Sequence, residues 1–379
     1  MKNETNDNRM KVMTILGTRP EIIRLSACLR ENDRVFKHTL VHTGQNYDYT
    51  LNEIFFEDLG LRAPDYYLEC AGAHLGETIG NIISRSYEIM LKIKPEALLI
   101  LGDTNSALAA ISAKRLKIPI FHMEAGNRCW DWNVPEMINR KIVDHISDVN
   151  LPYTEHARRY LLSEGMDGKF IFVTGSPMHE VILQSKEKID ASDILERLAL
   201  EKKKYIVVSA HREENIDNGK NFFELMSAIN SIAERYGYPV IFSTHPRTMK
   251  QIKDNNFVFH SLVRNIKPLG FLDYVRLQQC SYFVLSDSGT LSEESAILNF
   301  PAILIRTSTE RPEVLDKGTI LIGGITERDI LQAIEMALYA SMHENILAND
   351  YIDVNVSRKV VMAIQSYAKI VNIATWQKT

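Results

Sequence analysis

The sequence has few cysteines, no long apolar run and no Gly-x-Gly motif, and each absence argues against a class of protein. Its four cysteines lie far apart without a Cys-x-x-Cys pair, which argues against a disulfide framework or a cysteine zinc site and fits a reducing compartment. The apolar runs are much shorter than the roughly 20 residues of a membrane span. The missing Gly-x-Gly and Walker motifs argue against a dinucleotide-binding protein, a kinase and a P-loop ATPase.

The charge balance and the first residues argue against two further classes, nucleic-acid-coating proteins and secreted proteins. There are 44 basic and 48 acidic side chains, a net charge of −4, which argues against a protein that coats nucleic acid. Residues 1–10 are polar and lack the apolar core of a signal peptide, so we expect a mobile leader on a cytoplasmic protein without a membrane partner. His38 and His42 are four apart but fall on a predicted strand, so they are no helical metal pair, and we predict neither a metal nor a cofactor.

Short apolar runs that alternate with helical periodicity predict two parallel α/β sheets. A length of 379 residues also favours two domains. The predicted strands of the first series are Val12–Leu16, Thr39–His42, Ala97–Leu101, Ile118–Met123, Val149–Pro152 and Phe170–Thr174. Those of the second series are Tyr205–Ser209, Pro239–Thr244, Tyr282–Ser286, Ala302–Ile305 and Thr319–Ile322.

A seam near Thr174–Gln184 separates the two series. We predict an N-terminal α/β domain at residues 11–180 and a second domain at residues 181–354. An amphipathic helix within residues 355–379 is expected to close over a domain face. The predicted fold class is α/β, with two doubly wound Rossmann-like domains facing each other across a cleft. In such sheets ligands bind beyond the carboxyl ends of the strands.

Charged residues follow the predicted strands of the first domain. Arg19 follows Val12–Leu16 at a helix start that suits an anion, or is a plain surface arginine. Asp103 follows Ala97–Leu101 and is either a functional carboxylate or a helix N-cap. Glu124 follows the buried run Ile118–Met123, where a carboxylate is a costly core residue. Glu136 adds a third carboxylate, which taken alone reads as a surface residue.

The second domain carries polar groups that suit a nucleotide. His211 and His245 follow consecutive strands, which lowers the chance that either histidine is merely structural. Ser288 and Gly289 open a helix and present backbone N–H groups to a phosphate. Glu294 can accept hydrogen bonds from two vicinal hydroxyls, as on a ribose, or belong to a solvated helix face.

Taken together, seven motifs resemble the non-hydrolysing UDP-N-acetylglucosamine 2-epimerases in order and spacing. The resemblance runs from about Met10 to the C-terminus. The motifs are Gly17-Thr18-Arg19-Pro20-Glu21, Gly102-Asp103-Thr104-Asn105-Ser106, His122-Met123-Glu124-Ala125-Gly126, Pro135-Glu136 with Asn139-Arg140, His211-Arg212-Glu213-Glu214-Asn215, Asp287-Ser288-Gly289 with Glu293-Glu294, and Glu310-Arg311-Pro312-Glu313.

This resemblance implies a glycosyltransferase-B fold whose C-terminal helix crosses back to the first domain, a homodimer and a UDP-linked acetamido sugar as substrate. The candidate catalytic residues that it implies are Asp103, Glu124, Glu136 and His211. The candidate substrate-binding residues are Arg19, Arg24, Leu269, Tyr274, Ser288, Gly289, Thr290, Glu294 and Arg311.

Three departures from the family pattern point to a subgroup. Arg24 stands where the family usually has Lys. Asn46-Tyr47-Asp48-Tyr49 replaces the His-Arg-Glu-Met that helps to bind a second, activating substrate in many bacterial members, so the resemblance leaves allosteric activation open. The segment from Asn127 to Val134 also differs from the family loop. These features resemble the subgroup of capsule and O-antigen synthesis that forms UDP-N-acetyl-L-fucosamine from UDP-2-acetamido-2,6-dideoxy-β-L-talose.

The predicted reaction inverts C2 by eliminating UDP to a 2-acetamidoglycal and adding it back. Trp130 or Trp132 faces the C6 methyl of a 6-deoxy sugar in this prediction; the alternative is that both rings pack the loop. A UDP-N-acetylglucosamine/UDP-N-acetylmannosamine 2-epimerase is the alternative function. A hydrolysing epimerase, a glycosyltransferase and an inactive UDP-sugar sensor are further alternatives.

Overall fold

A computed structural model describes residues 8–45, 49–132, 134–343 and 347–378, without the side chains of residues 49–53 and 213–214. Most of the predicted leader therefore lies outside the described residues, as do residues 46–48 of the divergent segment and residue 133 of the tryptophan loop. The chain forms two units, one made of residues 1–183 and 352–379 and the other of residues 184–351.

Each unit is built on a six-stranded sheet in which every strand is parallel to its neighbours. In unit 1 the strand order is β3-β2-β1-β4-β5-β6, and in unit 2 it is β12-β11-β10-β7-β8-β9. Both orders are the doubly wound 3-2-1-4-5-6 arrangement, whose switch point lies between the first and fourth strands. The predicted class of two doubly wound α/β domains is confirmed.

The strands of unit 1 are β1 (Lys11–Leu16), β2 (Lys37–His42), β3 (Tyr66–Tyr67), β4 (Ala97–Leu101), β5 (Ile120–Met123) and β6 (Val149–Leu151). Its helices are α1 (Arg19–Val35), α2 (Tyr49–Asp58), α3 (Leu75–Ile93), η1 (Asn105–Leu108), α4 (Ala109–Arg115), α5 (Pro135–Ile146), α6 (Glu155–Ser163), η2 (Gly168–Phe170), α7 (Met178–Gln184) and α17 (Val356–Ala374), where α7 ends one residue inside unit 2.

The strands of unit 2 are β7 (Ile206–Ser209), β8 (Val240–Ser243), β9 (Val263–Ile266), β10 (Val284–Ser286), β11 (Ala302–Leu304) and β12 (Leu321–Ile322). Its helices are α8 (Lys186–Asp190), α9 (Ile194–Arg197), α10 (Glu213–Ile216), α11 (Gly219–Tyr236), α12 (Pro246–Asp254), α13 (Phe271–Cys280), α14 (Leu291–Leu298), α15 (Pro312–Asp316), α16 (Glu327–Ala340) and η3 (Asn349–Tyr351).

Continuous apolar strands place both sheets in the core. All five residues of β4 are buried, as expected when helices cover both faces of a parallel sheet. In unit 2, alternate residues of β7 enter opposite core layers, with Ile206 and Val208 on one face and Val207 on the other. This two-sided burial leaves the carboxyl ends of the strands as the place for polar side chains.

The predicted strand Phe170–Thr174 is wrong. Only an isolated bridge between Asn150 and Ile171 continues the sheet there, and Gly168–Phe170 forms a short 3-10 helix instead. Two strands absent from the prediction, β3 and β9, are short or half-exposed and carry no apolar run.

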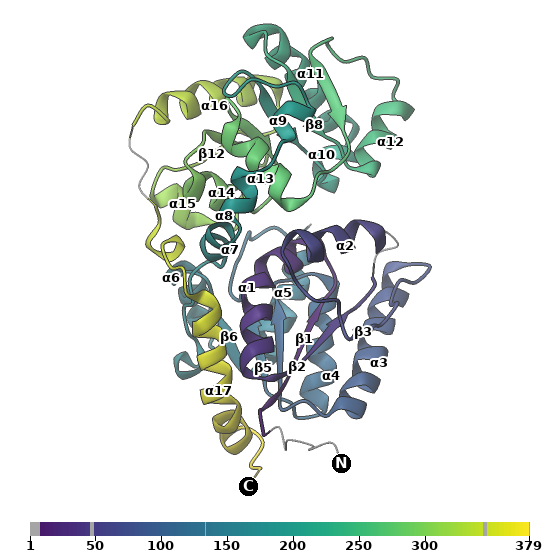
Figure 1. Cartoon of the computed structure of the whole chain (residues 1–379), viewed down its shortest axis with the longest axis vertical. Coiled ribbons are helices and arrows are strands. Elements are labelled where there is room, and N and C mark those ends of the chain that lie inside the picture. The colour runs from purple at the N-terminus through teal and green to yellow at the C-terminus, as the bar shows by residue number, and fades with distance from the viewer. Residues whose placement is uncertain (1–7, 46–48, 133, 344–346, 379) are drawn as a thin grey trace. The chain divides into compact units, whose positions relative to one another are not determined.

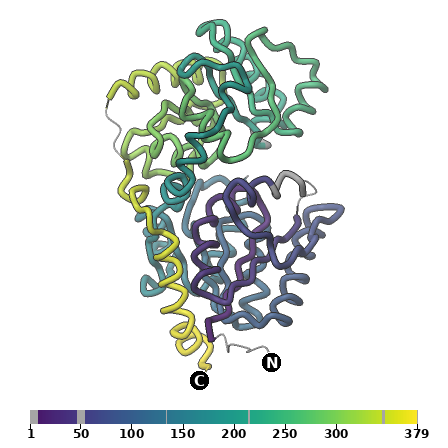
Figure 2. Tube along the Cα trace, viewed as in Figure 1, coloured from purple at the N-terminus to yellow at the C-terminus, as the bar shows by residue number. Residues whose placement is uncertain are grey.

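The C-terminal helix α17 belongs to unit 1 and lies beside α1 (Figures 1 and 2). Its buried face includes Val360, Ile364 and Val371. The Glu180 carboxylate, itself buried, accepts hydrogen bonds from the backbone N–H of Ser357 at 2.9 Å and from its hydroxyl at 2.5 Å. These bonds satisfy a first-turn N–H group and place a negative charge at the positive end of the helix. The return of the chain to the first domain is thus confirmed.

Candidate active site

Glu124 directly follows β5 and lies buried at the carboxyl edge of the unit 1 sheet, 3% exposed. Its backbone has φ of +60°, a left-handed conformation that costs free energy for a residue other than glycine. Its carboxylate forms ion pairs with Arg24 of α1 and with Arg140 of α5 at 3.1 Å, and Arg140 also donates to its backbone carbonyl. The predicted costly carboxylate is therefore present and is compensated by two buried cations.

Asp103 follows β4 and shares Arg140 with Glu124. Arg140 also forms an ion pair with the Asp103 carboxylate, which is 16% exposed. Asn139, the neighbour of Arg140 on α5, donates to the Asp103 carbonyl at 3.0 Å. Thr104, not Asp103, is the cap residue of the following 3-10 helix, so the alternative of a simple N-cap is wrong. Two of the predicted carboxylates are thus brought to one guanidinium.

A third buried carboxylate, Glu21 on α1, was not among the predicted site residues. It accepts hydrogen bonds from the Gly17 backbone N–H and from the hydroxyls of Thr18, Thr104 and Ser106. Burial raises the pKa of the Glu21 carboxyl, although these hydrogen bonds act in the opposite direction. Glu21 thereby joins the turn after β1 to the turn after β4, the two sides of the switch point. Its place in the Gly17–Glu21 motif was the signal available in the sequence.

The remaining predicted residues of unit 1 take up different positions. Arg19 is half-buried in the first turn of α1, with its guanidinium 6.0 Å from the centre of the Phe55 ring. Arg24, predicted to bind substrate, is 7% exposed and engaged with Glu124. Glu136 is exposed in the first turn of α5, one helical turn before Arg140.

Asp287 organises the corresponding edge of unit 2. It follows β10, is fully buried, and accepts hydrogen bonds from the backbone N–H groups of His211 and Arg212, both at 2.9 Å, and from the Asn215 side chain at 3.1 Å. Its other oxygen lies 3.1 Å from Nδ1 of His211, whose ring is half-exposed. Although burial alone would raise it, these partners lower the pKa of Asp287 to about 2. Asp287 fixes the predicted His211 at the switch point of this sheet.

The turn after Asp287 leads into α14. Ser288, Gly289 and Thr290 are half-exposed, and the hydroxyls of Ser288 and Thr290 lie 2.9 Å apart. A side chain at Gly289 would bring its Cβ within 3.1 Å of the Glu310 carboxylate. The backbone N–H groups of Ser288 and Thr290 donate to the hydroxyls of Ser286 and Ser288, at 3.1 and 3.4 Å, within this turn at the start of a helix, a position that suits a phosphate.

The other predicted residues of unit 2 lie around this turn at different depths. Glu294 of α14 is buried and accepts a hydrogen bond from Gln278 at 2.9 Å. Burial and the negative charge of Glu294 raise the pKa of Tyr274, whose hydroxyl also bonds to Ser209. Leu269 packs against the core layer of β10 and β11. Arg311 is buried beside Glu293, with 3.2 Å between their charged groups.

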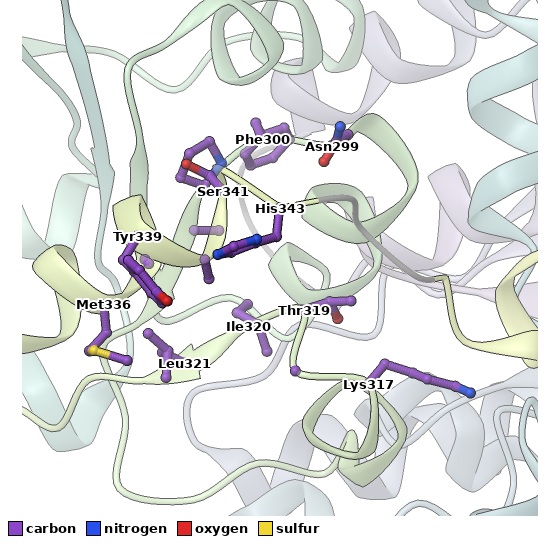
Figure 3. A pocket seen from close by; sticks show the side chains of 15 residues that line it. Asn299, Phe300, Lys317, Thr319, Ile320, Leu321, Met336, Tyr339, Ser341 and His343 are labelled. Atoms are coloured by element: carbon purple, nitrogen blue, oxygen red, sulfur yellow. The ribbon is translucent and has the colours of Figure 1, made fainter.

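A separate pocket of about 310 Å³ lies at the opposite edge of the unit 2 sheet (Figure 3). Its lining comes from residues 299–301 before β11, residues 317–320 before β12 and the end of α16, including Tyr339 and His343. In a parallel sheet these are the amino ends of the strands. The pocket contains none of the predicted site residues, so it is not the predicted nucleotide site.

The described residues show neither a metal-binding cluster nor a membrane-spanning helix. No group of three His, Cys, Asp or Glu side chains in the described ranges is arranged to hold a metal ion. Within the same part of the chain, no helix combines the length and apolar content needed to cross a membrane.

The two doubly wound sheets, with charged clusters at both switch points, define a protein of the glycosyltransferase-B type. Residues 29–365 match the family model described as UDP-N-acetylglucosamine 2-epimerase, and the chain belongs to this family of isomerases.

Relatives of known function agree over nearly the whole chain. The UDP-N-acetylglucosamine 2-epimerase of Methanococcus maripaludis is 35% identical over 362 residues, covering 93% of this chain and 98% of the relative. The UDP-2,3-diacetamido-2,3-dideoxy-D-glucuronate 2-epimerase of Pseudomonas aeruginosa is 32% identical, covering 89% and 94%. Family members thus differ in the sugar on which they act.

Two solved structures are similar in fold and sequence. The UDP-N-acetylglucosamine 2-epimerase from Rickettsia bellii has a TM-score of 0.90 and 45% identity, covering 98% of this chain and all of its own. The Methanocaldococcus jannaschii enzyme, solved in complex with UDP-GlcNAc and UDP, has a TM-score of 0.88 and 33% identity, covering 94% and 99%.

Proposed function

We propose that this protein is a non-hydrolysing 2-epimerase that inverts C2 of a UDP-2-acetamido sugar. The observation that carries the proposal is the convergence of Asp103 and Glu124 on Arg140 at the edge of a switch-point sheet, in a chain that belongs to this family. UDP-N-acetylglucosamine, the sugar nucleotide named for the relatives, is the first candidate substrate.

The reaction needs both acidic side chains near C2 and groups that bind the diphosphate of UDP. The C2–H of an acetamido sugar is not next to a carbonyl, so it is a very weak acid. When the C1–O bond breaks, its electron pair leaves with UDP, C1 becomes cationic and C2–H becomes acidic. A carboxylate of the Asp103, Glu124 and Glu136 set takes the proton, which leaves a 2-acetamidoglycal. A second acid returns a proton to the opposite face of C2 while UDP adds back to C1.

In this proposal unit 2 stabilises the departing UDP. The start of α14 at Ser288 and Gly289 supplies the Ser288 hydroxyl and the Gly289 N–H to the diphosphate, and His211, oriented by Asp287, adds a donor. Glu294 accepts from the ribose hydroxyls, and Tyr274 and Leu269 contact the uracil. A carboxylate close to C1 stabilises the positive charge of the oxocarbenium-like state, as in glycosidases.

Turnover in heavy water tests the reaction. We expect UDP-N-acetylglucosamine to yield its C2 epimer with deuterium at C2, because the proton that returns comes from a group that exchanges with solvent. The measurement is NMR of the product at early conversion. Product without solvent deuterium at C2 would contradict the elimination route, and release of free sugar would indicate a hydrolysing enzyme. The resemblance also implies a homodimer. Light scattering coupled to size-exclusion chromatography tests this by measuring the molar mass of the protein in solution.

A second candidate substrate, the UDP-linked 6-deoxy-L-talo sugar, is favoured by the loop between β5 and α5. Trp130 and Trp132 are 58% and 63% exposed, and the Lys141 ammonium lies over both rings. Both rings are thus accessible to a sugar, while Trp130 also lies edge-on to the Tyr160 ring at 5.5 Å between centroids, as the alternative of loop packing expects. Comparing kcat/KM for the two sugar nucleotides decides the matter. Faster turnover of the glucose-configured sugar would end the L-fucosamine assignment.

A further inference from the structure

His122 lies on β5 and is completely buried between the two strand tips that carry Asp103 and Glu124. Its Nε2 is 2.7 Å from the carbonyl oxygen of Gly102, the residue before Asp103. Its Nδ1 is 2.9 Å from a carboxylate oxygen of Asp144 on α5. The ring therefore contacts both the turn after β4 and helix α5.

Asp144 connects this histidine to the strained turn after Glu124. Besides its contact with His122, Asp144 accepts hydrogen bonds from the backbone N–H of Gly126 at 3.1 Å and from Arg128 at 2.7 Å. Gly126 has φ of +80°, and a Cβ there would lie 2.5 Å from the Ala157 carbonyl oxygen. The hydrogen bond from Gly126 to Asp144 thus fixes the turn that follows Glu124.

His122 lies within a group of buried charged side chains. Among the described residues, the ion pairs of this region include the anions Asp103, Glu124, Asp144 and Glu164 and the cations Arg24, Arg128 and Arg140, each at most 16% exposed. Lys141 and His145, which are more exposed, also approach Glu164. Buried charges are tolerated only when they are well paired, so the arrangement of this group depends on the contacts that hold β4, β5 and α5 together.

We propose that His122 is a positioning residue of the epimerase reaction, a buried ring that contacts both the Gly102 carbonyl and the Asp144 carboxylate. It thereby fixes the tips of β4 and β5 in the arrangement in which Asp103 and Glu124 share Arg140. The role rests on the proposed function, but His122 itself touches neither of the two carboxylates through its ring in the contacts described.

Two substitutions separate its two contacts. In H122Q the amide can still reach the Gly102 carbonyl but no longer bonds to Asp144, and in H122N the reverse holds. A displacement of about 1 Å at the reacting groups can cost about 10²-fold in rate, so we expect kcat to fall roughly 10- to 100-fold in both variants. KM is expected to stay within about threefold, because the residues proposed to bind UDP lie in unit 2.

His38 provides the matched control. It is another buried histidine of the same sheet, paired with Asp33 at 2.6 Å and with the Thr14 hydroxyl at 2.9 Å. It lies near the start of β2, at the edge of the sheet away from the strand tips. H38N and H38Q therefore disturb a comparable His–Asp pair, and their kcat is expected to remain within about threefold of the original. Losses in the His122 variants no larger than in the His38 variants would overturn the positioning role.

The contact of the ring with the Gly102 carbonyl is measured without substrate. In protein labelled with ¹⁵N-histidine, the resonances lost in H122N identify the residue, and its Nε2 proton is expected to be protected from exchange with solvent because it is buried and donates to that carbonyl. An Nε2 proton that exchanges as fast as that of an exposed histidine overturns the proposal, even if the variants fail to fold. Absence of any C2 epimerisation by the unsubstituted enzyme refutes the proposed function instead, so the two failures are distinguishable.

Discussion

Removing the guanidinium that Asp103 and Glu124 share should destabilise unit 1 far more than removing an exposed one. R140M keeps much of the side-chain volume but leaves two carboxylates without their common partner. Breaking a buried ion pair costs about 3–5 kcal/mol. Glu124 retains Arg24, and Asp103 is 16% exposed and can be hydrated, so the lower end applies. We expect the free energy of unfolding of unit 1 to fall by about 3 kcal/mol.

Tryptophan fluorescence isolates the unfolding of unit 1. The three tryptophans of the chain, Trp130, Trp132 and Trp376, all belong to this unit, so their emission does not report the unfolding of unit 2. With a urea m-value of about 1–3 kcal/mol/M, the loss corresponds to a midpoint lower by about 1–3 M.

An exposed arginine of the same unit is the control. Arg158 pairs with Glu155 one helical turn away on α6, and the two side chains are 37% and 45% exposed. Such a surface pair contributes about 0.5 kcal/mol or less, so R158M should barely move the urea midpoint. Equal midpoints for R140M and R158M would refute the conclusion that the shared guanidinium compensates buried charge.

The remaining predictions concern two further buried carboxylates, Asp287 and Glu180. The pKa of Asp287 is about 2, below the ordinary value of 3.8, so its ionised form stabilises unit 2 above about pH 4 and that stability is lost as the pH falls toward 2. D287N should remove about 2 kcal/mol of this pH-dependent stability. Circular dichroism measures the acid transition of unit 2, which tryptophan fluorescence does not report. An unchanged acid transition in D287N would contradict this prediction. E180A should lower the fluorescence-detected stability of unit 1 by about 2 kcal/mol, because the buried N–H and hydroxyl of Ser357 lose their acceptor, and an unshifted midpoint would show that water replaces the carboxylate.

The sheets were predictable wherever a strand is an apolar run buried on both faces. Ala97–Leu101 was predicted with its observed bounds. The missed strand β9 has the sequence Val-Arg-Asn-Ile and lies half-exposed at the edge of its sheet, so burial imposes no apolar pattern on it. Phe170–Thr174 is apolar without being a strand, because its side chains pack elsewhere: Phe172 lies against Tyr367 of α17.

The carboxylates of the site were predictable, but their partners were not. A charged residue after a buried strand is conspicuous in a sequence, which singled out Asp103 and Glu124. The cations that hold them come from distant positions, since Arg24 and Glu124 are 100 residues apart. The contact of His122, a residue of one predicted motif, with Asp144 was not predicted for the same reason, because it depends on how α5 packs beside β5. The left-handed backbone of Glu124 likewise follows from the surrounding contacts and not from its residue type.

The discontinuity of unit 1 has a consequence for how the protein is made. Residues 1–183 leave the ribosome well before α17, which covers α1 in the finished molecule, because the 168 residues from Gln184 to Tyr351 are synthesised in between. At about 5–20 residues per second, this interval lasts roughly ten to thirty seconds. During this time the nascent first sheet carries an uncovered helix, so chaperones that recognise exposed apolar surface have a defined moment at which to bind it.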